Sequence, residues 1–197
     1  MTIRSGEAVL VVIDLQNYFV RDVSAHIVPV IADLITRWRS AGNEVVFTRY
    51  VNRPGSPYER LLGWTECMEP PQIDVVDELR THAQQATAVI DKNGYSLFAD
   101  ADGAALIAGH GWQDIYLCGI ATENCVLATA LGAFELNLTP WLIEDASASH
   151  RGRPAHEAGV FVAGSFIGER QIISVADIPA LLTAPRSQGG LPVTDGR

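Results

Sequence analysis

The chain has 197 residues, of which 48% are hydrophobic, and a formal net charge of -9 at pH 7. This length predicts a single domain with a substantial core, and the acidic balance argues against nucleic acid or an anionic membrane surface as the main partner. Three cysteines at irregular spacing form no disulfide framework and favour a reducing compartment. The first apolar run, residues 8–13, is too short for a signal peptide or a membrane span, so we expect a cytoplasmic protein.

Short apolar runs rich in β-branched residues alternate with segments of helical periodicity. The apolar runs predict six strands, at residues 8–13, 44–48, 87–90, 115–118, 140–143 and 172–175. The segments between them predict helices at residues 24–40, 74–83, 100–110, 124–136 and 154–167. This alternation predicts a Rossmann-like α/β fold, with a six-stranded, mainly parallel sheet and helices on both faces. We place the domain at residues 1–184 and a flexible tail at 185–197.

One long segment, residues 51–73, has no regular pattern. It carries four prolines and two glycines, with Trp64 in its middle. A compact domain seldom keeps so long an irregular segment unless that segment covers a site. We therefore expect residues 51–73 to border the functional site.

The junction at residues 116–125 is the strongest chemical signal in the chain. An apolar strand breaks at Gly119, and a helix is predicted to begin near Asn124, which puts Cys125 at a helix N-terminus. The positive end of a helix dipole favours a thiolate, which is the nucleophilic form of cysteine. The alternative is a buried cysteine that acts as a small hydrophobic side chain, which is the better interpretation for Cys118 inside the strand.

Two further groups follow strands that end at the same edge of the predicted sheet. Asp14 and Lys92 come directly after strands, and this topology brings both to one crevice with Cys125. There Asp14 would take the thiol proton and later give it to the leaving nitrogen, while the charge of Lys92 would hold Asp14 ionised and lower the thiol pKa. The backbone N–H of Cys125 and the turn at residues 120–121 would supply an oxyanion site. Alternatively, Asp14 caps the next segment and Lys92 is a solvated charge.

Four sequence motifs carry a family resemblance over residues 8–175. They are residues 12–19 (VIDLQNYF), 91–98 (DKNGYSLF), 118–126 (CGIATENCV) and 144–150 (EDASASH). With Asp14, Lys92 and Cys125 in this order, the chain resembles the isochorismatase-like cysteine hydrolase superfamily, in its metal-free, nicotinamidase-like and N-carbamoylsarcosine amidohydrolase-like branch.

The resemblance implies a chemistry and an assembly. It implies an Asp14, Lys92 and Cys125 triad that hydrolyses an amide or carbamoyl carbon–nitrogen bond of a small molecule through a thioester. It also implies a homo-oligomer, a dimer or a tetramer. A cis peptide between Ile120 and Ala121 is implied as well, and it would turn the Ala121 N–H into the oxyanion hole beside that of Cys125.

Two departures from the family narrow the expectation. Metal-binding nicotinamidases carry an aspartate and histidines after the second strand, where this chain has residues 48–53 (TRYVNR), so we expect no metal and no cofactor. True isochorismatases lack the nucleophilic cysteine that this chain has. Both named activities are therefore disfavoured.

Several side chains near the motifs are candidates for substrate contact. Phe19 and Tyr95 would wall a pocket, Trp64 would close over it, and Gln16 would bond to a carbonyl or amide of the substrate, although each aromatic ring has the alternative of core packing.

Two arginines and two competing functions are further alternatives. Arg49 or Arg53 would pair with a substrate carboxylate or lie on the surface. Two other functions compete with hydrolysis. One is a non-catalytic small-molecule-binding homologue, and the other is a thiol redox protein that uses Cys118 and Cys125.

Overall fold

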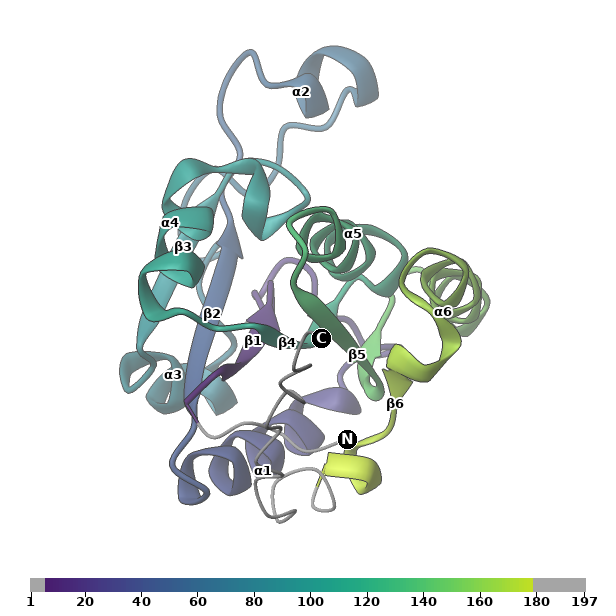
Figure 1. The fold of residues 1–197 in the computed structure, drawn as a ribbon. Coiled ribbons are helices and arrows are strands. Elements are labelled where there is room, and N and C mark those ends of the chain that lie inside the picture. Colours follow the sequence, from purple (N-terminus) through teal and green to yellow (C-terminus); the bar gives the residue numbers. More distant parts are fainter. Residues whose placement is uncertain (1–5, 179–197) are drawn as a thin grey trace, which may run out of the picture.

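The fold is a single layer of strands between two layers of helices (Figure 1). The computed structural model describes residues 6–178. The strands are β1 (Ala8–Ile13), β2 (Glu44–Tyr50), β3 (Ala88–Lys92), β4 (Asp114–Ile120), β5 (Thr139–Ala148) and β6 (Ile172–Ile173). The α-helices are α1 (Ile27–Ser40), α2 (Pro57–Leu62), α3 (Asp77–Gln84), α4 (Ala101–His110), α5 (Leu127–Glu135) and α6 (Arg153–Ile167). Short 3-10 helices at residues 97–99, 169–171 and 175–177 and a π-helical turn at Thr122–Val126 complete the elements.

The strand order is β3-β2-β1-β4-β5-β6, and every paired strand runs parallel to its neighbour. This confirms the predicted single-domain α/β fold with a parallel sheet. The chain builds outward from β1 to β3 and then returns to place β4 on the other side of β1. The strand order therefore reverses between β1 and β4, which is where ligands bind in open α/β sheets.

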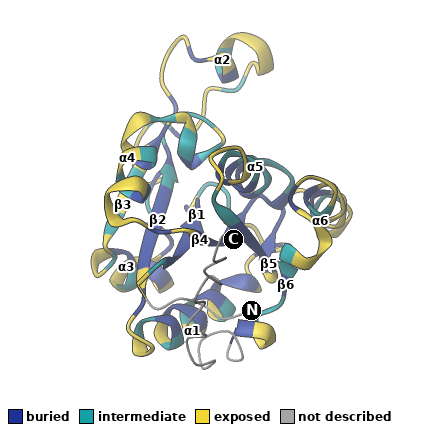
Figure 2. Ribbon diagram, in the orientation of Figure 1, coloured by how far each residue is buried: buried dark blue, intermediate teal, exposed yellow. Residues whose placement is uncertain are grey.

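The two faces of the sheet form two apolar cores. In β1, Leu10 and Val12 face the core built with α1 and α3, whereas Val11 and Ile13 face the core built with α4, α5 and α6. Figure 2 shows the strands as a buried layer with exposed residues on the outer surfaces of the helices. Because all six β1 residues are at most 1% exposed, the continuous apolar run is explained by burial on both faces.

Strand β5 extends beyond its predicted end. It continues to Ala148, and its register with β4 shifts between the pair Leu117 and Leu142 and the pair Gly119 and Ser147. The sequence pattern predicts that the strand ends before residues 144–145. In the structure these exposed residues lie at the irregularity, and the strand continues past them. A bulge lets a strand carry exposed residues and then resume pairing, and no local pattern signals it.

The segment at residues 51–73 contains α2, a helix that the sequence pattern did not predict. Ser56 caps it by accepting a hydrogen bond from the Glu59 N–H, and Pro57 occupies the first turn. Figure 1 shows α2 standing away from the rest of the fold.

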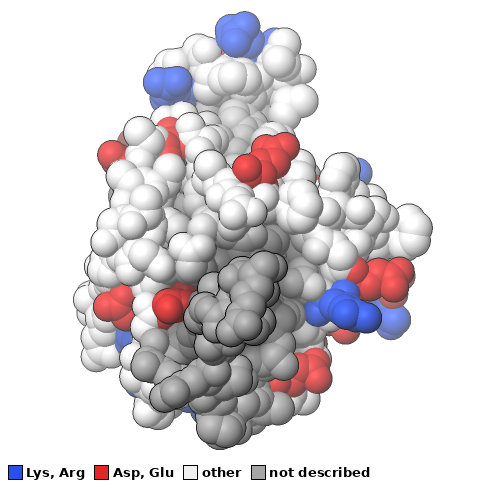
Figure 3. All heavy atoms as spheres, viewed as in Figure 1, with Lys and Arg blue, Asp and Glu red and all other residues white. Residues whose placement is uncertain are grey.

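The predicted domain boundary at residue 184 and the tail at 185–197 lie outside the described residues. Within residues 6–178, no helix has the length and apolar character needed to cross a membrane. On the face seen in Figure 3, basic and acidic side chains are scattered and form no continuous basic patch.

Candidate active site

Asp14 and Lys92 form a buried ion pair at the carboxyl ends of the strands. Lys92 ends β3, and its Nζ lies 2.7 Å from Asp14 Oδ2, with both side chains 0% exposed. Asp14 Oδ1 accepts a hydrogen bond from Thr48 Oγ1 at 2.7 Å, and Lys92 Nζ also donates to the Gly94 carbonyl at 3.0 Å. Both carboxylate oxygens of Asp14 are therefore bonded to side chains of β2 and β3, so Asp14 does not cap the next segment. Lys92 is buried and is not a solvated surface charge.

The electrostatics of the pair favour a charged lysine. Burial acts to lower the pKa of Lys92, but the charge of Asp14 and its hydrogen bond to Lys92 act in the opposite direction, and the pKa is raised. The ammonium group is therefore retained inside the protein. Its environment also includes the Tyr50 ring, whose centroid is 5.6 Å from Nζ.

Cys125 lies in the π-helical turn Thr122–Val126 that precedes α5, so the helical backbone begins two residues before the predicted Asn124. Its side chain belongs mainly to the core with α5 and α6, and the residue is 8% exposed. Burial is the largest influence on the thiol and raises its pKa, Lys92 lowers it, and Asp14 raises it. Burial therefore opposes the thiolate that a helix N-terminus favours, and the net effect is a raised thiol pKa.

The end of β4, which leads into the cysteine segment, approaches β1 closely. Gly119 has φ +123°, and a Cβ there would meet the Ile13 carbonyl oxygen at 2.2 Å. Because Ile13 and Gly119 are register partners, this contact holds the start of the cysteine segment beside Asp14. The peptide bond between Ile120 and Ala121 is cis.

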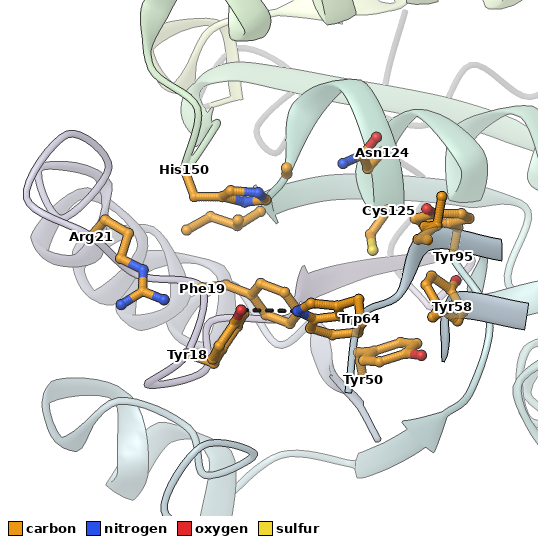
Figure 4. A pocket seen from close by; sticks show the side chains of 13 residues that line it. Tyr18, Phe19, Arg21, Tyr50, Tyr58, Trp64, Tyr95, Asn124, Cys125 and His150 are labelled. Atoms are coloured by element: carbon orange, nitrogen blue, oxygen red, sulfur yellow. Dashed lines mark hydrogen bonds between the residues drawn. The ribbon is translucent and has the colours of Figure 1, made fainter. Parts of the chain in front are cut away.

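Cys125 opens into a cavity of about 370 Å³ (Figure 4). The predicted contact residues Phe19, Trp64 and Tyr95 line it, together with Ala121. The ring centroids of Phe19 and Trp64 are 6.2 Å apart, a distance typical of packed aromatic pairs. The full lining consists of Tyr18, Phe19, Arg21, Tyr50, Tyr58, Leu62, Trp64, Tyr95, Ile120, Ala121, Asn124, Cys125 and His150.

Gln16 does not contact this cavity, and its prediction as a substrate ligand is wrong. Its Nε2 donates to the carbonyls of Tyr50 at 2.9 Å and Ile73 at 3.0 Å, and its Oε1 accepts from the Tyr50 N–H at 2.7 Å. Both N–H donors of this fully buried amide are used by backbone carbonyls, its oxygen is held by the Tyr50 N–H, and Gln16 is not part of the cavity lining. Gln16 instead ties the end of β2 to the segment at residues 51–73.

The two arginines considered for a substrate carboxylate lie outside the cavity lining. Arg49 forms a bidentate ion pair with Asp91, with both contacts at 2.7 Å. Arg53 is exposed.

Several lining residues were missed by sequence reasoning. Tyr50 ends β2 and His150 follows β5, so the same strand-end argument that found Lys92 would have found both. Tyr18 has a clear structural role, because its hydroxyl accepts a hydrogen bond from Trp64 Nε1 at 2.9 Å. Arg21, in the loop after β1, had no signal in its sequence neighbourhood.

The residues after β2 are occupied with local bonds. Asn52 Oδ1 accepts from the Tyr50 hydroxyl at 3.1 Å, and its Nδ2 donates to the Trp64 carbonyl at 3.2 Å. In the part of the chain that the structure describes, no three His, Cys, Asp or Glu side chains form a group that could hold a metal ion.

The fold and this site define an isochorismatase-like hydrolase architecture. An Isochorismatase domain matches residues 8–165, and the chain belongs to the isochorismatase family. It is 30% identical over 149 residues to phenazine biosynthesis protein PhzD of Pseudomonas fluorescens, with 72% of this chain and 71% of that protein covered. It is 25% identical over 212 residues to ureidoacrylate amidohydrolase RutB of Azorhizobium caulinodans, with 90% and 91% covered.

Solved structures share the fold. A cysteine hydrolase from Pseudomonas syringae pv. phaseolicola superposes with a TM-score of 0.81 at 18% identity, covering 92% of this chain and 95% of that one. N-carbamoylsarcosine amidase from Thermoplasma acidophilum superposes with a TM-score of 0.72 at 23% identity, covering 86% and 96%.

Proposed function

We propose that this protein is a cysteine hydrolase that cleaves an amide or carbamoyl carbon–nitrogen bond of a small molecule. The observation that carries the proposal is the buried Asp14 and Lys92 pair within hydrogen-bond reach of Cys125, which opens into an apolar cavity. An acid, a fixed cation and a thiol at one point are the parts that acyl transfer through sulfur requires. Relatives named as amidohydrolases and amidases support the same reaction class.

In the first step the Cys125 sulfur attacks the carbonyl carbon of the substrate, and its proton passes to Asp14. Because burial raises the pKa of the Cys125 thiol, nucleophile and base act together in this mechanism, and the sulfur becomes anionic only as the carbon–sulfur bond forms. We assign the developing oxyanion to the backbone N–H groups of Ala121 and Cys125, both of which belong to residues that line the cavity.

The second half returns the enzyme to its starting state. The carbon–nitrogen bond breaks, Asp14 gives its proton to the leaving nitrogen, and the acyl group stays on Cys125 as a thioester. Water then attacks the thioester carbonyl and gives a proton to Asp14, the carbon–sulfur bond breaks, and the proton returns to sulfur. Lys92 acts as a positioning residue that stabilises Asp14 as a carboxylate through its charge and hydrogen bond.

The assembly and location are part of the proposal. We propose a homo-oligomer, a dimer or a tetramer, that works in the cytoplasm on a small-molecule substrate without a metal or cofactor. Helices α5 and α6 pack against each other, and they carry Phe134, Phe161 and Phe166, which are each at least half exposed. Exposed large apolar side chains that lie near one another are typical of subunit interfaces, which supports the oligomer. Light scattering on the purified protein tests the subunit number.

A panel of amides, ureides and carbamoyl compounds, assayed for ammonia release, tests the activity. Turnover of a panel member should fall by about 10⁴-fold or more in Cys125→Ala, while thermal unfolding is retained. Cys118→Ala is the matched control, because Cys118 is packed in the opposite core of the sheet. Retained turnover in Cys125→Ala would refute the mechanism, and binding without turnover by the unmodified protein would identify a binding homologue instead.

A further inference from the structure

We infer that the substrate is an anionic amide or carbamoyl compound, whose carboxylate binds Arg21 and His150 at the end of the cavity away from Cys125. This inference rests on the proposed function and specifies its substrate class. In Figure 4, Arg21 and His150 lie at one end of the cavity and Cys125 and Tyr95 at the other, with Phe19 and Trp64 between them.

Arg21 brings an unpaired positive charge to the cavity. Arg21 is an exposed residue, and among the arginines of residues 6–178 it is the one that lines this cavity. Four of the others, Arg37, Arg49, Arg80 and Arg153, each form an ion pair with a nearby acid. No carboxylate of the described residues lies within ion-pair distance of Arg21, and the described lining of the cavity contains no aspartate or glutamate. In a chain with a net charge of -9, an arginine left unpaired at a cavity is a binding group for an external anion.

The guanidinium is also positioned toward the cavity wall. Its central carbon lies 4.9 Å from the centroid of the Tyr18 ring, which is a cation–π contact. Tyr18 in turn accepts the hydrogen bond from Trp64 Nε1, and the two rings are 5.6 Å apart. The group that orients Arg21 is thus anchored to the aromatic wall, and the guanidinium keeps its planar donors for a carboxylate.

His150 supplies a second donor at this end. Its ring lies 5.9 Å from the Phe19 ring, and its Nδ1 is buried without a partner. Burial lowers the pKa of His150, with the charges of Arg21 and Arg151 also lowering it and that of Glu123 raising it, so the ring is neutral near pH 7. A proton on Nε2 avoids a buried, unsatisfied N–H at Nδ1, which leaves Nε2–H as the donor for a ligand.

The rest of the cavity favours a substrate whose middle portion is uncharged. Between its two ends the lining is aromatic, with Phe19, Tyr50, Tyr58 and Trp64, and favours a small planar or apolar spacer. An amide with a carboxylate at its far end satisfies Cys125 and Arg21 together. A cationic amide would meet Arg21 as a like charge and is selected against.

A charge-matched pair of probes tests the inference. N-carbamoyl-β-alanine and its methyl ester carry the same carbamoyl group and differ in charge. In Arg21→Gln, kcat/KM for the acid should fall about tenfold or more, with a change of less than about twofold for the ester, and Arg21→Lys should restore part of the loss. His150→Phe should lower kcat/KM for the acid more than for the ester.

Arg53→Gln is the matched control, since it removes the same charge from an exposed residue that does not line the cavity. It should leave kcat/KM for both probes within about twofold of the unmodified protein. Equal losses for both probes in Arg21→Gln, or no loss for either, would overturn the inference. A larger selective loss in Arg53→Gln than in Arg21→Gln would overturn it as well.

Binding measured without turnover separates this inference from the proposed function. By calorimetry, Cys125→Ala should bind the acid about tenfold more tightly than the ester, and the added Arg21→Gln change should abolish the difference. If the unmodified protein hydrolyses neither probe nor any other amide while this difference holds, the proposed function fails and the anion site stands. If Cys125→Ala binds both probes equally, or binds neither, the anion site fails whatever the outcome for hydrolysis.

Discussion

Asp14 and Lys92 are 78 residues apart in the chain and share one buried hydrogen-bonded ion pair, with Lys92 Nζ 2.7 Å from Asp14 Oδ2. Strand β2 lies between the strands that carry them, and its Thr48 bonds to the second oxygen of Asp14. The pair therefore joins three strands at the edge where the cavity opens. Its removal should affect stability and chemistry separately, and each effect can be measured.

Lys92→Met should destabilise the protein by about 3 to 5 kcal/mol, because it leaves the Asp14 carboxylate buried without its partner. The measurement is the free energy of unfolding in urea. Arg49→Met is the matched control, because it breaks the more exposed pair with Asp91 and should cost about 1 kcal/mol or less. Asp14→Asn combined with Lys92→Met should be less destabilised than Lys92→Met alone, and a fully additive result would contradict the coupling.

The same pair sets a pH dependence of stability. The pKa of Lys92 is raised above its ordinary value of 10.5 in the folded protein, so its stabilising contribution is fully present below pH 10.5. That contribution is lost as the pH rises through the folded-state pKa. The difference in unfolding free energy between the unmodified protein and Lys92→Met should therefore be constant from about pH 7 to 9 and shrink above about pH 10.5.

Asp14→Asn should separate ionisation of the thiol from turnover. The Asp14 carboxylate raises the pKa of the Cys125 thiol, so its removal lowers that pKa, and iodoacetamide should alkylate Cys125 faster at pH 7 than in the unmodified protein. Amide hydrolysis should nevertheless fall by about 10³-fold or more, because the proton acceptor is missing. Alkylation and turnover that fall together would show that Asp14 acts only by holding the fold.

Gly119→Ala should destabilise the protein by about 3 kcal/mol or more, since its Cβ would overlap the Ile13 carbonyl oxygen and the residue has φ +123°. Gly109→Ala is the control in α4, where a Cβ meets nothing within 4 Å. That change should stabilise the protein by up to about 1 kcal/mol. Thermal unfolding of both variants gives the comparison, and similar midpoints would argue against the close approach of β1 and β4.

Trp64→Ala should raise KM by about five- to thirtyfold and change kcat by less than about threefold, because it removes part of the cavity wall and none of the groups assigned to the reaction. Trp64→Phe keeps the ring but loses the bond to Tyr18, and it should give an intermediate KM. Leu61→Ala is the control, as Leu61 is a neighbouring residue on α2 that is 74% exposed and does not line the cavity. A loss confined to kcat in Trp64→Ala would place Trp64 in the chemistry instead of the wall.

The outline of the fold could be predicted because each strand has a local signature. The apolar run of β1 and the alternation of strands and helices are enough to specify a parallel sheet, and its topology brings Asp14 and Lys92 to one edge. The structural role of Gln16 could not be predicted in this way. Its three hydrogen bonds reach residues 34 and 57 positions away, and nothing beside it in the sequence indicates that these backbone groups need a partner.

The direction of the pKa shift of the Cys125 thiol could not be predicted from the sequence either. The position of Cys125 near a helix start predicted a lowered thiol pKa, but the depth of burial decides the direction, and burial depends on how α5 and α6 pack. In the same way, Arg21 belongs to no sequence motif, and its place in the cavity lining depends on how the loop after β1 folds.

The backbone conformation at Asp14 limits which acidic residues this position can accept. Asp14 has φ 51°, a left-handed conformation that aspartate, asparagine and glycine adopt far more readily than longer side chains. Its neighbours Ile13 and Leu15 pack in the two apolar cores of the sheet, so a carboxylate at either position would lie among apolar side chains and away from Lys92. In a library randomised at codon 14, selection for growth on the substrate should return aspartate alone, and selection for solubility should also admit asparagine and glycine but not glutamate.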